Sequence, residues 1–256
     1  MVTNKPTEPE VVLIIGGGPG ISASCARHCS AAGMRVAVAA RNPDKPALQK
    51  LTDQYGVRCY GCDAADADAV SQLFDTVKAE LGVPTLVIHN IDGRMEGIFR
   101  KSAVDADPVL VQQVMQNSAY SAFLVGQQAA TTMLTRTPRN PDGHRGTLIF
   151  TNASAAFRGY AKSAAFAMAS HAKAGLAQSL ARELMPQGIH VAHVPIDAAI
   201  GWTREDGRRA HWLAGDSEAD NMADPDHIAA LYLQLHQQHR STWAFEVVLR
   251  PWTETW

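Results

Sequence analysis

The sequence lacks long hydrophobic runs and blocks of like charge. None of its apolar stretches approaches the roughly 18 residues that a bilayer-spanning helix needs, and residues 1–10 are polar with two prolines, unlike a secretory signal. The formal net charge is −2, and Lys and Arg never form a block, which argues against a surface for nucleic acid or acidic lipid. We therefore expect a soluble, cytoplasmic protein whose partner is a small molecule, with no nucleic-acid or membrane partner.

Cysteine is scarce as well. The chain has four cysteines, at Cys25, Cys29, Cys59 and Cys62. Their spacing alone makes a zinc site conceivable. The first pair, however, falls on an expected helix, and the second falls at the end of an expected strand, where side chains alternate in direction. We expect reduced thiols.

The histidines show no metal-site pattern either. His190 and His193 have an odd spacing on an expected strand, so they face opposite sides of it. His236 and His239 share a helical face but lack an evident third ligand. We expect no metal ion.

What the sequence has in quantity is short apolar runs that alternate with helical segments. Hydrophobic residues make up 46% of the 256 residues, and the strand-like runs are continuously apolar, which is typical of a parallel sheet covered on both faces. We predict an α/β fold, a Rossmann-type doubly wound parallel sheet of about seven strands with helices on both faces, in a single domain over 1–256. The predicted strands are 10–15, 35–40, 57–62, 85–90, 147–151, 189–194 and 244–249, and the predicted helices are 21–32, 66–81, 108–134, 164–184 and 225–239.

One long stretch, 197–224, has no strong periodicity and follows the carboxyl end of a predicted strand. Long irregular segments in that place commonly cover a ligand. We predict that it is a substrate lid.

A glycine cluster carries the first chemical signal. Gly16-Gly-Gly-Pro-Gly20 lies between the first predicted strand and the first predicted helix. Glycines there let the backbone turn tightly and let a pyrophosphate approach, while the helix N-terminus supplies N–H donors and the positive end of its dipole. The cluster alone is also compatible with an ordinary glycine turn, but its place in a βαβ unit favours a dinucleotide site.

The spacing of Gly16 and Gly20, with Ser22 in the third place, resembles the Gly-x-x-x-Gly-x-Gly of the short-chain dehydrogenase/reductase family. Further matches to that family follow in its order along nearly the whole chain: Cys62-Asp63, Asn90 within His89-Asn-Ile-Asp92, Asn117, Gly175-Leu176, Ser179-Leu-Ala-Arg-Glu-Leu184 and Gly188-Ile-His-Val191. The resemblance implies an NAD(P) site in which Asp63 meets the adenine amino group. The implied cofactor-binding residues are Gly16, Gly18, Pro19, Gly20, Ile21, Arg41, Asp63, Ala64, Asn90 and Pro195.

Arg41 distinguishes the two nicotinamide cofactors. It is the first charged residue after the second predicted strand, where the adenosine ribose is expected. An acidic residue there would accept hydrogen bonds from a 2′-hydroxyl, whereas an arginine would bind a 2′-phosphate. Asp44 comes three residues later, too late to serve as that acid. We predict NADP rather than NAD, with a merely solvated arginine as the alternative.

The catalytic positions of the family are mostly lost. Aligning the family's active-site helix on Gly175-Leu176 places Phe166 at the tyrosine, Ser170 at the lysine and Ala153 at the serine. Asn117 is the one member of the catalytic tetrad that remains. Phenylalanine has no ionisable proton, and losing a positioned acid or base typically lowers a rate by ~10²–10⁴.

Three substitutes for the lost groups are conceivable. Lys173 lies about one helical turn after Ser170, so its ammonium can reach back toward the vacated lysine position, unless it simply packs against a neighbour. Tyr160, in the loop before that helix, can supply a hydroxyl or serve only as a pocket wall. His89 and Asp92 can act as an acid/base pair, although a histidine at a strand end is usually structural.

Three functions remain open at this point. The first is an NADP-dependent oxidoreductase that acts on a small carbonyl or alcohol by an atypical mechanism. The second is a catalytically inactive dinucleotide-binding protein, and the third is a scaffold reused for non-redox chemistry.

The resemblance also implies a homodimer or homotetramer. Trp243, Trp252 and Trp256, near the end of the chain, are expected in the core or at a subunit interface.

Overall fold

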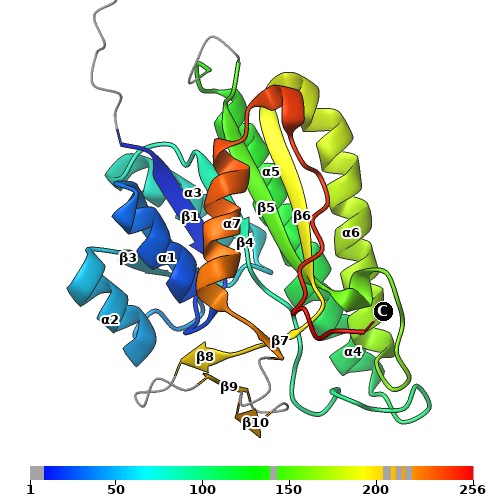
Figure 1. Ribbon diagram of the computed structural model, residues 1–256. Helices are drawn as coiled ribbons and strands as arrows, with labels where there is room; N and C mark the ends of the chain where they lie inside the picture. The colour runs from blue at the N-terminus through cyan, green and yellow to red at the C-terminus, as the bar shows by residue number, and fades with distance from the viewer. Residues whose placement is uncertain (1–8, 139–142, 204–208, 212–214, 217–220, 256) are drawn as a thin grey trace, which may run out of the picture.

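The central element of the fold is a six-stranded parallel sheet of order β3-β2-β1-β4-β5-β6 (Figure 1). The computed structural model describes residues 9–138, 143–203, 209–211, 215–216 and 221–255. The strands are β1 (Val11–Ile15), β2 (Arg35–Ala40), β3 (Arg58–Gly61), β4 (Leu86–His89), β5 (Gly146–Ala153) and β6 (Ile189–Ile196). The predicted doubly wound α/β fold in one domain is confirmed.

Helices cover both faces of the sheet because its strands are apolar on both. Every residue of β1 is buried, and so is every residue of β6. One face packs on α1 (Ile21–Ala31), α2 (Pro46–Tyr55) and α7 (Pro225–Gln237). The other packs on α3 (Ala67–Glu80), α5 (Ser121–Leu134) and α6 (Ala164–Leu184), with α4 (Pro108–Met115) against α6. Single 3₁₀ turns occur at Ser154–Ala156, Met185–Gln187 and Arg240–Thr242.

Helix α2 was not predicted from the sequence. It begins with Pro46, whose fixed φ suits the first helical position, and it ends before Gly56, whose φ is 65°. Leu48 and Leu51 are its buried contacts with the sheet. The proline and glycine were therefore the signal, but two apolar residues gave too little periodicity to predict a helix.

The predicted helix 108–134 is interrupted. A π-helical turn, Gln116–Tyr120, separates α4 from α5 and contains Asn117. The Ser121 hydroxyl donates to the Asn117 carbonyl at 2.6 Å and lies 3.1 Å from the Ser118 carbonyl. Such side-chain bonds compete with the helical ladder, and π turns are frequent at functional sites. The apolar periodicity of the sequence continues through the turn and does not reveal it.

The predicted seventh strand, 244–249, runs parallel to β6 but forms only isolated bridges with it. The His193 N–H donates to the Phe245 carbonyl at 2.7 Å, and the Leu249 N–H donates to the Pro195 carbonyl at 2.9 Å. Pro195 has no N–H, so the bond that this position would donate in a parallel ladder is missing. The sheet therefore has six regular strands and a partly bonded seventh segment.

The predicted lid, 197–224, lies partly outside the described residues. Within it, β7 (Ala199–Ile200) pairs with β11 (Met222–Ala223) in parallel. The short antiparallel strands β8 (Trp202–Thr203), β9 (Arg209–His211) and β10 (Gly215–Asp216) lie beyond the carboxyl ends of the main strands (Figure 1). This position suits a lid, and that role stays a prediction.

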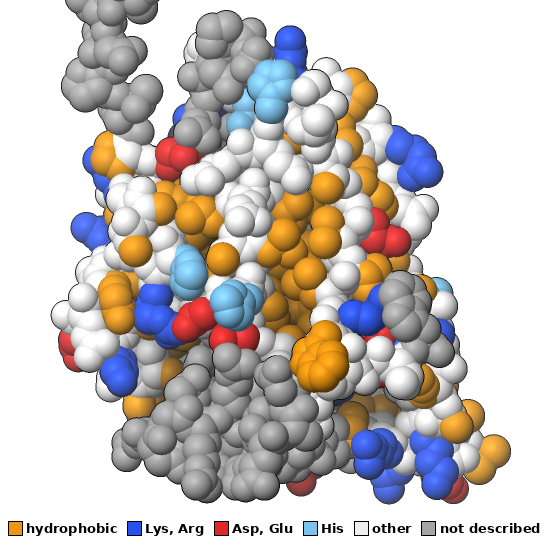
Figure 2. Space-filling model, viewed as in Figure 1, with side chains coloured by type: hydrophobic (Ala, Val, Ile, Leu, Met, Phe, Trp, Pro, Cys, Tyr) orange, Lys and Arg blue, Asp and Glu red, His pale blue; other side chains and the backbone are white. Residues whose placement is uncertain are grey.

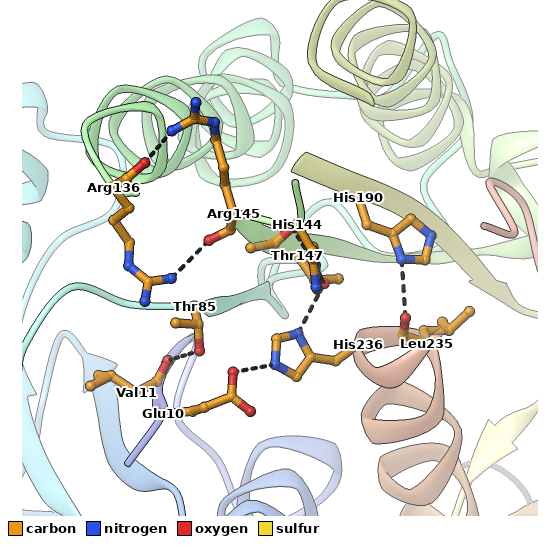
Figure 3. A network of polar contacts seen from close by, with 11 residues as sticks. Glu10, Val11, Thr85, Arg136, His144, Arg145, Thr147, His190, Leu235 and His236 are labelled. Atoms are coloured by element: carbon orange, nitrogen blue, oxygen red, sulfur yellow. Dashed lines mark hydrogen bonds and ion pairs between the residues drawn. The ribbon is translucent and has the colours of Figure 1, made fainter. Parts of the chain in front are cut away.

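Buried histidines hold the opposite end of the sheet together (Figure 3). His236 of α7 contacts the Thr147 hydroxyl at 2.9 Å and the Glu10 carboxylate at 3.2 Å. His190 donates to the Leu235 carbonyl at 3.0 Å, and its ring stacks on Trp243 with ring centroids 5.0 Å apart. These histidines therefore fasten α7 and the C-terminal segment to the sheet.

The remaining expectations concern the tryptophans, the cysteines, metal sites and membrane-spanning helices. Trp252 is exposed rather than in the core, and Trp256 lies outside the described residues. The four cysteines form no disulfide. In the described ranges, no group of three His, Cys, Asp or Glu side chains is placed to hold a metal ion. None of the described helices combines the length and the apolar composition needed to cross a membrane.

Candidate active site

A cavity of about 590 Å³ opens at the carboxyl ends of the main strands. Its volume is within the range usual for small-molecule sites. Most of the predicted site residues line it: Gly16, Gly18, Pro19, Gly20, Ile21, Arg41, Asp63, Ala64, Asn90 and Asn117. Pro195 does not, because it is buried inside β6. The structure therefore brings the predicted cofactor residues together, apart from this proline.

The glycine loop leaves backbone donors facing this cavity. Gly20 precedes the first turn of α1, and no side chain in the described part of the protein caps that helix. The first N–H groups of a helix have no partner inside it and carry a partial positive charge, so they suit an anion. A Cβ at Gly18 or Gly20 would meet no atom within 4 Å, which shows that the space above the loop is open. The loop therefore fits the pyrophosphate of a dinucleotide.

Ser22 links this loop to the end of β4. Its hydroxyl donates to the Gly16 carbonyl at 2.8 Å, and the Asn90 amide donates to the Ser22 oxygen at 2.8 Å. Ser22 stands where the related motif has its third glycine. The serine thus fastens the loop to Asn90, at the middle of the cavity.

Alanine substitutions at two glycines should separate folding from binding. Gly16 has φ +104°, and a Cβ there would lie 2.3 Å from the Asn90 carbonyl oxygen, so Gly16→Ala should lower the free energy of unfolding by roughly 2–4 kcal/mol. Gly18→Ala has free space and should leave stability near that of the wild type while its methyl group hinders a bound pyrophosphate. Urea unfolding and cofactor titration of both variants measure this. Equal stability losses would contradict the loop geometry.

Two cations lie at the end of the cavity that follows β2. Arg41 and Lys45 are both exposed and both line it, whereas Asp44 does not. Sequence reasoning missed Lys45, although a second basic residue four positions after Arg41 was a usable signal. Asp63 also lines the cavity, and its carboxylate accepts from the Ala65 N–H at 3.0 Å.

The other end of the cavity lacks the family's acid and base. Ala153 and Phe166 line it, and Ser170 is buried outside it. The Asn117 amide lines it too and donates to the Met95 sulfur at 3.3 Å, which is a weak bond. Asn117 is thus the polar side chain that the π turn presents there.

Lys173 does not fill the vacated lysine position. Its side chain is fully buried beneath the cavity, and its ammonium donates to the carbonyls of Ile91 at 2.5 Å and Thr151 at 3.3 Å. Burial lowers the pKa of Lys173 to about 8, although the charge of Asp92 acts in the opposite direction. The lysine therefore ties together the backbone that follows β4 and the backbone of β5.

His89 and Asp92 do not form an acid/base pair. His89 is fully buried, and its Nε2 bonds to the Ser121 hydroxyl at 2.9 Å. Its Nδ1 has no hydrogen-bond partner among the described residues. Burial, followed by the charge of Lys173, holds the pKa of His89 well below its ordinary value, so the ring stays neutral. Asp92 instead pairs with Arg94 at 2.6 Å.

Tyr160 is also absent from the cavity lining. It is half exposed, and its ring centroid lies 5.5 Å from the Arg158 guanidinium carbon. The structure places two titratable residues at this end, Arg94 and His211, which sequence reasoning missed. Arg94 stacks on the ring of Phe166 at 4.9 Å. No local pattern marked either residue, because the tertiary fold alone brings them to the cavity.

Comparison with known proteins agrees with this geometry. The family profile described as Enoyl-(Acyl carrier protein) reductase matches residues 17–245. The chain is similar to (+)-cis,trans-nepetalactol synthase of Nepeta racemosa, with 29% identity over 91% of this chain and 86% of that one. It is also similar to 3-oxoacyl-(acyl-carrier-protein) reductase MabA of Mycobacterium tuberculosis, with 28% identity over 68% of this chain and 62% of that one.

Solved structures share the fold. A short-chain dehydrogenase from Rhodopseudomonas palustris superposes with a TM-score of 0.76 and 28% identity, over 95% of this chain and 99% of that one. A metagenomic short-chain oxidoreductase in complex with NADP gives a TM-score of 0.76 at 21% identity, over 97% and 99% of the two chains. The profile match and the fold together show that this chain belongs to the short-chain dehydrogenase/reductase family, an oxidoreductase family that binds NAD(P).

Proposed function

We propose that this protein binds NADP(H) and transfers hydride between it and a small carbonyl or alcohol substrate, with no proton donor at position 166. The observation that carries the proposal is the continuity of the cavity. One cavity extends from the Arg41 and Lys45 side chains, past the glycine loop, to Ala153 and Phe166. A dinucleotide laid along it would have its phosphates at the loop and its reactive end beside Phe166.

The cation pair supports NADP over NAD. A 2′-phosphate carries about two negative charges, and Arg and Lys are the side chains that bind phosphate best. NAD needs an acidic side chain near Arg41 that accepts a hydrogen bond from the ribose 2′-hydroxyl. The acidic residue next in sequence, Asp44, does not line the described cavity. A 2′-phosphate would balance both cations.

The substrate end would orient the reactants rather than donate a proton. The bound cofactor supplies the hydride. Among the described residues the Asn117 amide donates to a sulfur alone, and it can exchange that weak bond for one to the substrate carbonyl oxygen. Phe166 and Ala153 give the reacting carbon an apolar wall. The proton that completes the alcohol then comes from solvent, and we expect a slow enzyme for that reason.

A non-redox reaction is the second candidate function. Two observations favour it: the acid, base and orienting residues of the family are absent at positions 153, 166 and 170, and one relative is named a synthase. NADP(H) binding without hydride transfer would support this candidate, or an inactive binding protein, over the oxidoreductase.

Restoring the family residues tests the proposed chemistry. Phe166→Tyr together with Ser170→Lys should raise any carbonyl reductase rate at least tenfold, because the pair supplies a positioned acid, which is worth ~10²–10⁴. Phe166→Leu, which adds no ionisable group, is the matched control and should not raise the rate. Ser170 is buried, so cofactor titration must first show that the double variant folds. A lower rate in the folded double variant would mean that the chemistry uses other groups.

We also propose that the chain forms a homodimer or homotetramer. Tyr120, Phe123 and Met168 are exposed on the α5 and α6 side. Figure 2 shows further hydrophobic side chains gathered between α7 and α6, over the C-terminal segment. Light scattering measures the mass in solution, and a monomer at all concentrations would contradict this proposal.

A further inference from the structure

Basic side chains surround the outer edge of the substrate end. A second, small cavity of about 20 Å³ adjoins the first, and Arg94 and Phe166 line both. Arg100, Lys101 and Lys162 also line the small cavity. We call Arg94, Arg100, Lys101 and Lys162 the basic rim. Figure 2 shows Lys and Arg side chains along this edge, over the loop that precedes α4.

The charge of the basic rim is poorly balanced. Asp92 pairs with Arg94, with its oxygen 2.6 Å from Nη2 and 2.7 Å from Nε. Nη1 of Arg94 makes no hydrogen bond within the described part of the chain. Arg100, Lys101 and Lys162 form no ion pair within it either. Among the side chains that line the two cavities at this end, these four cations are accompanied by one carboxylate, Asp92, so the lining carries an excess of positive charge.

The backbone of the rim is held in an unusual conformation. Arg100 has φ 56° and Lys162 has φ 61°, and they are the only non-glycine residues with positive φ in the described ranges. L-residues seldom adopt this region, and such residues gather at ligand sites. The two residues belong to different loops, one before α4 and one before α6. Both strained positions therefore bring a basic side chain to the same small cavity.

Aromatic rings fix the orientation of the two guanidinium groups. The Arg94 carbon lies 4.9 Å from the centroid of Phe166, and the Arg100 carbon lies 5.4 Å from that of Phe99. Stacking leaves the N–H groups of a guanidinium uncovered. Arg94 uses Nη2 and Nε for Asp92, so its Nη1 and the guanidinium of Arg100 remain for a planar or tetrahedral anion. Phe166 thus serves here as a platform for Arg94, where the family has its tyrosine.

We propose that the basic rim binds a carboxylate or phosphate on the substrate, so that the substrate is an apolar carbonyl compound with one anionic group. This rests on the proposed function, which places the reacting carbon beside Phe166. The apolar body would contact Phe166 and Ala153, and the anion would lie at Arg94, Arg100 and Lys162. A solvated basic surface without a ligand is the alternative that the experiment excludes.

The test compares two anionic probes with a neutral one, and benzoate and benzamide have nearly the same shape. Protein saturated with NADP⁺ is titrated by calorimetry with benzoate, phenyl phosphate and benzamide. We expect at least one of the two anions to bind at least tenfold more tightly than benzamide. The preferred anion tells a carboxylate substrate from a phosphate substrate.

Variants assign that preference to the rim. Arg94→Gln, Arg100→Gln and Lys162→Gln should each lower the affinity for the preferred anion severalfold and leave benzamide unchanged. Arg100→Gln and Lys162→Gln leave the ion pair between Arg94 and Asp92 intact. A loss of anion affinity in these two variants therefore cannot come from repulsion by an unpaired Asp92 carboxylate. Arg182→Gln, an exposed arginine of α6 outside both cavities, is the matched control and should have no effect.

The outcomes separate this inference from the proposed function. Tight NADP⁺ binding with equal affinity for all three probes, or with no effect of the three rim variants, would overturn the inference and leave the proposed function standing. If NADP⁺ fails to bind, the proposed function fails, and the same titration is made on the free protein. Rim-dependent anion binding there would still support the anion site, and its absence would overturn it.

Discussion

Replacing Arg41 and Lys45 together with alanine is expected to lower the affinity for NADPH by roughly 100-fold or more and to leave the affinity for NADH within about threefold. Each charge-assisted hydrogen bond to a phosphate contributes about 1.5–3 kcal/mol, so two such contacts account for that loss. NADH has no 2′-phosphate and gains nothing from either cation. Titration of both reduced cofactors, followed by their fluorescence, measures the ratio.

Single variants show how the two cations share this contact. Arg41→Ala and Lys45→Ala should each lower NADPH affinity by about tenfold or more. Asp44→Ala is the control between them, because Asp44 is exposed and does not line the cavity. If the double variant lost NADPH and NADH affinity equally, the cations would serve a part common to both cofactors, and the assignment of NADP would be wrong.

Lys173→Met is expected to remove a large pH dependence of stability. The pKa of Lys173 is lowered from 10.5 to about 8 by burial. Between those two values the unfolded chain holds a proton that the folded chain has released, so the free energy of unfolding rises with pH across this window. The size of the shift corresponds to a rise on the order of 3 kcal/mol.

The measurement is the difference between wild type and variant in urea unfolding from pH 7 to 10.5. The difference is needed because burial raises the pKa of Cys29 to about 12 and of Cys62 to about 11, and both effects lower stability as pH rises through 9. Both proteins contain those thiols, so their contributions to the pH dependence cancel in the difference. Lys78→Met, at an exposed site on α3, is the control. A difference that stays flat with pH would show that folding does not lower the pKa of Lys173.

The fold was predictable because its signals are local. Continuous apolar runs such as Val11–Ile15 indicate a buried parallel strand, and the glycines before α1 indicate the loop. Errors arose where one residue changes a regular element. Pro195 removes one bond beside β6, and the π turn at Asn117 adds a wide turn without altering the apolar pattern.

The cofactor residues were predictable for the same reason, whereas the substrate end was not. The glycine loop, Arg41 and Asp63 each begin within two residues of a strand end, so the sheet brings them together. Lys173 and Arg94 depend on contacts between distant segments. The ammonium of Lys173 reaches the Ile91 carbonyl 82 residues away, and Arg94 stacks on Phe166. Sequence spacing gives the face of the helix on which Lys173 lies, but it does not give the group that either side chain contacts.

The central claim, hydride transfer from NADPH without a tyrosine acid, is tested most directly by isotope transfer. NADPH carrying deuterium at C4, prepared separately as each of the two stereoisomers, is incubated with the protein and a set of aryl and alkyl ketones and aldehydes, half of them bearing a carboxylate. Mass spectrometry then follows the label. We predict that one stereoisomer transfers deuterium to the carbinol carbon of a product, with one NADP⁺ formed per label. If NADPH binds tightly but its deuterium never leaves with any compound of the set, the protein is not the proposed oxidoreductase.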